Sequence, residues 1–119
     1  MSALNPFQEQ VERNLGKLEA RAEFDGQQLW LTFYISAPPG NLKRLSEALE
    51  YRGWTNLDGG QGGFLYPKVQ VGRTVTAIVD AATATQGLCI QFGAAIDGID
   101  ADTTADMQSQ FETLYLAPT

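Results

Sequence analysis

The feature that most constrains the fold is the stretch of residues 27–52, in which an alternating segment leads through a Pro-Pro-Gly corner into an amphipathic one. Apolar residues occupy every second position from 29 to 35, the period of a β-strand. After the corner, leucines recur at helical spacing, which predicts a helix over residues 41–53 with one apolar face. The apolar positions are Leu29, Leu31, Phe33 and Ile35, then Leu42, Leu45 and Leu49. We therefore expect the chain to fold around this strand and the helix packed on it.

Two further helices are predicted from capping residues. The first is expected to begin at Asn5-Pro6, with Asn as cap and Pro at the first helical position, and to end at Asp25-Gly26. The last is expected to begin at Thr103, with Asp106 in its first turn, and to end before Pro118. Their predicted apolar stripes are Phe7, Val11, Leu15, Leu18 and Ala22 in the first, and Met107, Phe111 and Leu114 in the last.

The remaining strands are read from short β-branched or alternating runs between glycine-rich turns. The expected ranges are 54–57, 64–71, 74–81 and 88–96. Pro67 has no N–H to donate, so its strand is expected at a sheet edge or a bulge. The glycine-rich residues 58–63 are expected to form a flexible connection with no regular structure.

This order of elements predicts a single α+β domain over residues 1–119, because a chain of this length suits one hydrophobic core. The order is α-β-α-β-β-β-β-α, with three helices and four to five strands. The loops between the later strands are too short for crossover helices, so the sheet is expected to be mainly antiparallel.

The charge is unevenly distributed. The chain has 14 acidic and 8 basic residues, a net charge of −6, and residues 74–119 contain no Lys or Arg. An acidic surface repels phosphate backbones, so direct nucleic-acid binding is not expected. The same charge favours a partner with a basic surface, or serves solubility alone.

The expected location is the cytoplasm. The N-terminal residues lack the basic and apolar regions of a secretory signal, and no apolar run approaches membrane-spanning length. The single cysteine, Cys89, forms no internal disulfide framework and suits a reducing compartment.

The sequence predicts no catalytic set, no cofactor and no metal site, so we expect a protein that is not an enzyme. It contains no histidine, the usual general base near neutral pH. Residues 58–63 lack the Lys and Ser/Thr of a phosphate-binding loop. An EF-hand starting at Asp100 would have Ala105 in place of the required Gly and Phe111 in place of the bidentate Glu. The acidic residues near it are instead expected to be exposed.

Aromatic residues are the strongest functional signal. If the odd-numbered residues of the first strand face the helices, Trp30 and Tyr34 point to the opposite side, and Tyr66 follows the same alternation in its own strand. Aromatic side chains anchor interfaces and line pockets. The alternative is that a helix covers this face.

We therefore expect a small acidic protein-interaction module: an adaptor, an inhibitor, or an immunity- or chaperone-type regulator. Its partner is expected to be another protein with a basic surface, such as a nucleic-acid-handling one. The alternative is a small-molecule-binding domain that uses the aromatic sheet face. A homodimer is compatible with both, because an edge strand and an aromatic face can each self-associate. The candidate partner-binding residues are Trp30, Tyr34, Tyr66, Asp97, Asp100, Asp102 and Asp106.

Overall fold

The computed structural model describes residues 7–19, 28–53, 55–59, 64–102 and 112–117. Its elements in chain order are α1 (Gln8–Glu19), β1 (Gln28–Ser36), α2 (Pro39–Tyr51), β2 (Thr55–Gly59), β3 (Phe64–Gly72), α3 (Val75–Gln91), β4 (Ala95–Asp102) and β5 (Glu112–Leu116). The predicted α+β class, with three helices and an antiparallel sheet, is confirmed.

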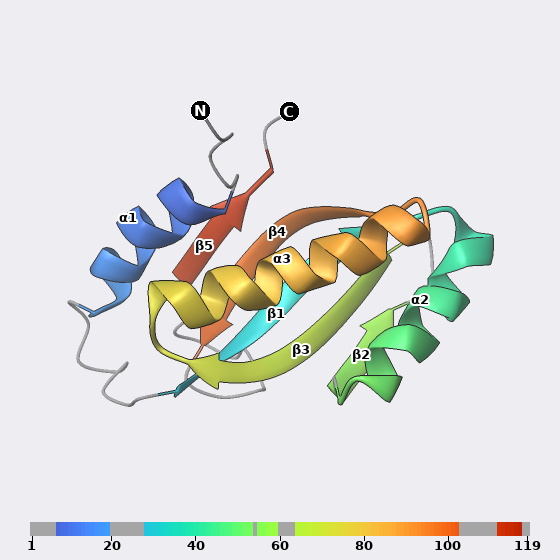
Figure 1. Cartoon of the computed structure of the whole chain (residues 1–119), viewed down its shortest axis with the longest axis horizontal. Coiled ribbons are helices and arrows are strands. Elements are labelled where there is room, and N and C mark those ends of the chain that lie inside the picture. Colours follow the sequence, from blue (N-terminus) through green and yellow to red (C-terminus); the bar gives the residue numbers. More distant parts are fainter. Residues whose placement is uncertain (1–6, 20–27, 54, 60–63, 103–111, 118–119) are drawn as a thin grey trace.

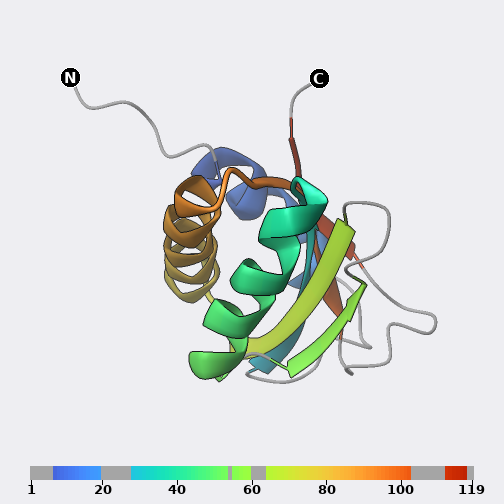
Figure 2. The same ribbon diagram turned by 90° about the vertical axis from the view of Figure 1, so that its right-hand side faces the viewer.

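The sheet has the strand order β2-β3-β1-β4-β5, and each neighbouring pair is antiparallel. All three helices lie on one face of it (Figure 1), which is clearest when the sheet is viewed along its edge (Figure 2). The first predicted strand is therefore the middle strand of the sheet.

The core lies between the sheet and the helices. The four odd-numbered apolar residues of β1 are at most 1% exposed, as their alternation predicts. They share one buried cluster with the apolar stripes of α1 and α2, which were also predicted. The buried members are Phe7, Val11 and Leu15 in α1 and Leu42, Leu45 and Leu49 in α2. Leu18 and Ala22, predicted for the same stripe of α1, have no described side chains.

The prediction was wrong for residues 74–91, where α3 replaces an expected strand, a turn and the start of another strand. Thr74 caps this helix, since its side-chain oxygen accepts a hydrogen bond from the Ala77 N–H at 3.1 Å. The buried residues recur at helical spacing: Ile78, Val79, Ala82, Thr85, Leu88 and Cys89. Burial of this face outweighs the preference of Val, Ile and Thr for strands. Within the described ranges, neither α3 nor another helix has the length and hydropathy that a membrane span needs.

The chain after β4 also differs from the prediction. The expected last helix lies mostly outside the described residues, as does its start at Thr103. Its expected C-terminal part is instead strand β5, in which Leu114 and Tyr115 are buried. Tyr115 packs edge-on against Phe7 with ring centroids 4.7 Å apart. Leu114, which was assigned to a helix stripe, thus belongs to the sheet, whereas Met107 and Phe111 of the same predicted stripe lie outside the described residues.

Strand β2 extends to Gly59, so part of the predicted flexible connection is paired with β3. The register between β2 and β3 shifts between the pairs Thr55–Lys68 and Asp58–Tyr66, opposite Pro67. The expected bulge at Pro67 is confirmed, because a residue without an N–H cannot continue that ladder. Trp54, the glycine-rich residues 60–63 and the predicted ends of the first helix, Asn5-Pro6 and Asp25-Gly26, lie outside the described residues.

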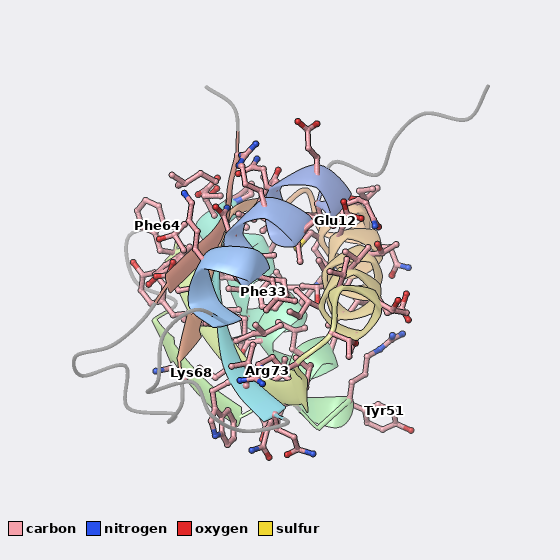
Figure 3. The ribbon with its side chains drawn as sticks, turned by 90° about the vertical axis from the view of Figure 1, so that its left-hand side faces the viewer. Glu12, Phe33, Tyr51, Phe64, Lys68 and Arg73 are labelled. Carbon is pink, nitrogen blue, oxygen red and sulfur yellow. The ribbon has the colours of Figure 1, made fainter. Side chains whose placement is uncertain are left out.

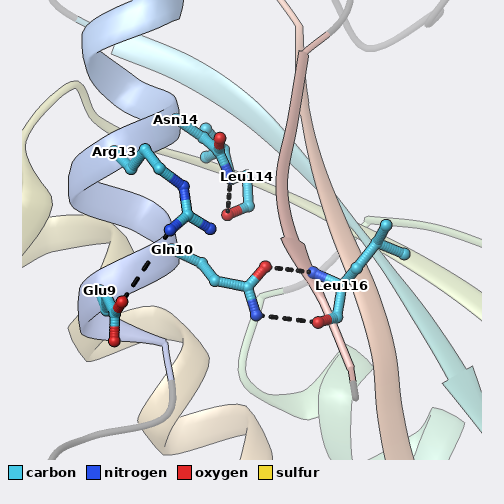
Figure 4. Close-up of polar contacts among 6 residues, drawn as sticks. All are labelled: Glu9, Gln10, Arg13, Asn14, Leu114 and Leu116. Atoms are coloured by element: carbon cyan, nitrogen blue, oxygen red, sulfur yellow. Dashed lines mark hydrogen bonds and ion pairs between the residues drawn. The ribbon is translucent and has the colours of Figure 1, made fainter. Parts of the chain in front are cut away.

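The outer edge of β5 is capped by side chains of α1 (Figure 4). The Gln10 amide donates to the Leu116 carbonyl at 2.9 Å and accepts from the Leu116 N–H at 3.0 Å. Asn14 donates to the Leu114 carbonyl at 3.0 Å. These are the backbone groups that a further strand would use, so α1 blocks strand addition at this edge.

Candidate functional site

The face of the sheet turned away from the helices carries the candidate site. Strand pairing brings together on this face Trp30, Thr32 and Tyr34 of β1, Phe64, Tyr66 and Lys68 of β3, and Asp100 of β4. We call this set the helix-free face. Figure 3 shows Phe64 and Lys68 on the side of the sheet opposite α3, whereas Phe33 lies between the sheet and the helices. The predicted aromatic face thus exists, and none of the three described helices covers it.

The aromatic part of this face centres on Tyr34. Its ring packs edge-on against Tyr66, with ring centroids 5.6 Å apart and an interplanar angle of 72°. It also lies over Gly98 of β4, where an added Cβ would come within 3.5 Å of the Tyr34 ring and 3.3 Å of the Tyr115 carbonyl oxygen. Gly98 therefore leaves the space that the ring occupies. Trp30, Tyr34 and Tyr66 all remain partly exposed.

A row of polar residues crosses the sheet between the Trp30 and Tyr34 positions. Thr32 of β1 has Lys68 of β3 as its partner on one side and Asp100 of β4 on the other. Partners on neighbouring strands are about 5 Å apart, so these side chains are adjacent.

Within this row Asp100 is only 6% exposed. The Tyr34 hydroxyl donates a hydrogen bond of 2.5 Å to Asp100 Oδ2. Burial, followed by this hydrogen bond and the nearby carboxylate, raises the pKa of Tyr34 well above its ordinary value of 10.0. Tyr34 therefore remains a protonated donor at neutral pH.

Thr32 has a buried hydroxyl group whose hydrogen-bonding capacity is unused. Its side chain is 3% exposed and its hydroxyl has no hydrogen-bond partner. A buried hydroxyl without a partner costs about 1–3 kcal/mol relative to its hydrated state. By contrast, Thr85 of α3 is equally buried, and its hydroxyl donates to the Ala81 carbonyl at 2.8 Å.

The four acidic candidates do not form one exposed cluster. The expectation that they are exposed was wrong for Asp100, which is buried opposite Thr32 and accepts a hydrogen bond from Tyr34. Asp97 is exposed at the irregularity between β1 and β4, away from the Thr32 row. The backbone of Asp102 pairs with Trp30, but its side chain is not described, and Asp106 lies outside the described residues.

Lys68 and Phe64 also belong to this face, although neither was among the candidate residues. Both follow the alternation of Tyr66 within β3, which was the available signal. Phe64 is 45% exposed. The pairing of Thr32 with Asp100 had no local signal, because it depends on which strands are neighbours.

The helix side of the molecule has a separate hollow of about 130 Å³. It is lined by Arg52, Val69, Ala81, Ala84, Thr85 and Leu88, and none of the sequence-predicted site residues borders it.

Cys89 of α3 is buried and unpaired, and burial raises the pKa of its thiol to about 11. A protonated, buried thiol is a poor nucleophile.

Among the residues that the structure describes, no group of three or more Cys, Asp or Glu side chains is placed to hold a metal ion. The helix-free face thus offers aromatic rings, a buried carboxyl group, a buried hydroxyl and the Lys68 side chain. No protein-family model matches the chain, and no curated protein or solved structure matches it either.

Proposed function

We propose that this protein is a non-enzymatic interaction module that binds another protein through its helix-free face. The observation that carries the proposal is the gathering of Trp30, Tyr34 and Tyr66, all partly exposed, on the sheet face that the three helices leave uncovered. Aromatic side chains supply much of the binding energy in protein interfaces because they bury a large area with few rotatable bonds.

The partner that we propose has a basic surface. The chain's net charge of −6 would speed its encounter with such a partner and disfavour acidic ones. The subtypes that fit are an adaptor, an inhibitor or a chaperone-type regulator of a basic or nucleic-acid-handling protein. The cytoplasm is the compartment we propose, because Cys89 is a free thiol.

Site-specific cross-linking tests this function. The photo-reactive residue p-benzoylphenylalanine replaces either Tyr66 on the helix-free face or Tyr51 on α2, which is 92% exposed. Both variants exchange one tyrosine for one larger aromatic residue, so they differ only in position. We expect a discrete cross-linked protein from position 66 and none from position 51 when extracts of the source cells are irradiated.

The salt dependence of that cross-link tests the basic partner separately. Exposed charges are screened over about 10 Å at 0.1 M ionic strength and about 3 Å at 1 M, so the yield at position 66 should fall as salt rises. A cross-link from position 51 alone would contradict the proposed face. A yield at position 66 that salt does not change would contradict the basic partner.

A small-molecule-binding domain remains the second candidate, and the unpartnered hydroxyl of Thr32 favours it. Ligand sites place a few polar groups among aromatic ones in this manner. Trp54→Phe leaves Trp30 as the single tryptophan, so its fluorescence reports on the helix-free face. A saturable change with one member of a metabolite panel would support this candidate, and no change with any member would count against it.

A further inference from the structure

Asp100 has no cationic partner among the described residues. Between described residues an ion pair joins Arg13 and Glu9 on α1, and the Tyr34 hydroxyl donates a hydrogen bond to Asp100. Removing a carboxylate from water is costly unless a cation or several donors replace the water. At 6% exposure Asp100 accepts a hydrogen bond from Tyr34, and because an ionised carboxylate can accept about four in all, it can accommodate further donors.

Thr32 points to the same conclusion independently. Its buried hydroxyl has no partner, and Asp100 is its direct neighbour across β1 and β4. The unpartnered hydroxyl of Thr32 and the largely buried carboxylate of Asp100 thus lie on neighbouring strands in the middle of the helix-free face. Trp30 and Tyr34 flank them along β1, one on each side of Thr32.

From this arrangement we infer that the helix-free face binds an arginine side chain of the partner protein. A guanidinium group has five N–H donors in a planar fork, which suits the neighbouring oxygens of Asp100 and Thr32. Its plane also stacks on aromatic rings, which Trp30 and Tyr34 provide. A lysine ammonium fits less well, because it is a strongly hydrated point charge without a stacking plane.

The position of Lys68 indicates on which side of Thr32 the guanidinium group binds. Lys68 flanks Thr32 from β3 and already has an interaction of its own. Because β1 lies between β3 and β4, Lys68 is two strand spacings, about 10 Å, from Asp100. The guanidinium therefore binds on the β4 side of Thr32, where it is closest to the carboxylate and farthest from the Lys68 ammonium. Trp30 or Tyr34 must shift to admit it, since the Thr32 hydroxyl is covered.

This inference rests on the proposed function and specifies what the partner presents. N-acetyl-arginine amide is the probe, and N-acetyl-citrulline amide is its control, since citrulline has nearly the same shape without the charge. Binding is measured from Trp30 fluorescence in the Trp54→Phe protein and from NMR shifts of the Trp30, Thr32 and Asp100 resonances. We expect saturable binding of the arginine probe and at least about tenfold weaker binding of the citrulline probe, because a hydrogen bond to a charged group contributes that factor or more.

Matched variants locate the binding site. Asp100→Asn keeps an acceptor for the Tyr34 hydroxyl but removes the negative charge. It should weaken the binding of the arginine probe about tenfold. Asp80→Asn removes the same charge from an exposed residue of α3 and should leave binding within about twofold, since exposed charges contribute little. Circular dichroism checks that each variant is folded. If Asp100→Asn does not fold, the arginine–citrulline comparison on the Trp54→Phe protein tests the arginine site by itself.

Equal binding of the two probes, no saturable response to the arginine probe, or equal effects of the two Asp variants would each overturn the arginine site. The cross-link at position 66 reports on the proposed function independently. If that cross-link forms but the arginine probe does not bind, the helix-free face is still an interaction face and its proposed specificity for arginine is wrong. If the cross-link is absent as well, the face itself is wrong.

Discussion

The two sides of strand β1 differ sharply although they alternate along the same nine residues. The side facing the helices consists of apolar residues that are almost fully buried, such as Phe33 at 0% exposure. The other side carries two partly exposed aromatic residues and the buried, unpartnered Thr32. The first arrangement is what stability requires. The second includes an unsatisfied polar group, which a protein optimised for stability alone would replace.

The largest expected difference between the two sides is in stability. Phe33→Ala should lower the free energy of unfolding by about 3–5 kcal/mol, because it empties a closed part of the core. Trp30→Ala, on the other side of the same strand, should cost less than half as much since its side chain is only partly buried. Urea denaturation measures both. Equal losses would mean that the helix-free face is packed like a second core.

Tyr34→Phe should have the next largest effect, because it leaves the buried carboxyl group of Asp100 without its hydrogen-bond donor. We expect a loss of about 1–3 kcal/mol near neutral pH, the usual cost of an unsatisfied buried polar group. Tyr66→Phe is the control, since it keeps the ring contact with Tyr34. An equal loss in both variants would show that the hydrogen bond from Tyr34 to Asp100 adds nothing to the free energy of unfolding.

The same variant has a signature at high pH. Because the folded-state pKa of Tyr34 is raised above 10.0, the unfolded chain loses this proton first. The contribution of Tyr34 to stability is therefore complete below about pH 10 and declines as the pH rises toward the folded-state value. The unfolding free energy should fall less steeply above pH 10 in Tyr34→Phe than in the unmodified protein. Identical slopes would contradict the raised pKa.

Thr32→Val and Thr85→Val form a matched pair with opposite expected signs. Both replace a buried threonine hydroxyl by a methyl group, but only Thr85 loses a hydrogen bond, the one to Ala81. Thr32→Val should therefore raise the unfolding free energy by up to about 1 kcal/mol, and Thr85→Val should lower it by a similar amount. Thermal and chemical denaturation of the pair provide the measurement. A destabilising Thr32→Val would mean that its hydroxyl has a partner in solution.

An effect of similar size is expected at the sheet edge. Gln10→Ala removes both hydrogen bonds to the backbone of Leu116 and should cost about 1 kcal/mol. It should also increase self-association in light scattering, because the freed edge of β5 can pair with a second chain. Gln8→Ala, on the same helix, is the control. If Gln10→Ala leaves self-association unchanged, α1 does not guard this edge.

The sequence predicted the parts of the fold that depend on local pattern. The alternation in β1 and the leucine spacing in α2 identified the core, because each element buries one regular face. The β-branched residues of α3 misled the assignment, since the helical spacing from Ile78 to Cys89 outweighs their strand preference. The alternation of Trp30, Tyr34 and Tyr66 likewise identified the aromatic half of the site.

Asp100 was among the candidate residues, but its burial beside Thr32 could not be predicted. Asp100 is buried because β4 pairs with β1 in one particular register, which places Asp100 opposite Thr32. No local pattern encodes that register, since residues 32 and 100 are far apart in the chain. The charge of the C-terminal region suggested a solvated acidic surface, whereas Asp100 is buried and bonded to the Tyr34 hydroxyl.

The most direct test of the account is the affinity of the captured partner for Tyr66→Ala and Tyr51→Ala, two single tyrosine truncations on opposite sides of the sheet. Titration calorimetry gives the Kd for each variant and for the unmodified protein. We expect Tyr66→Ala to weaken binding at least about tenfold, as loss of an aromatic anchor does, and Tyr51→Ala to leave the Kd unchanged. A loss confined to Tyr51→Ala would contradict the account and place the interface on the helices.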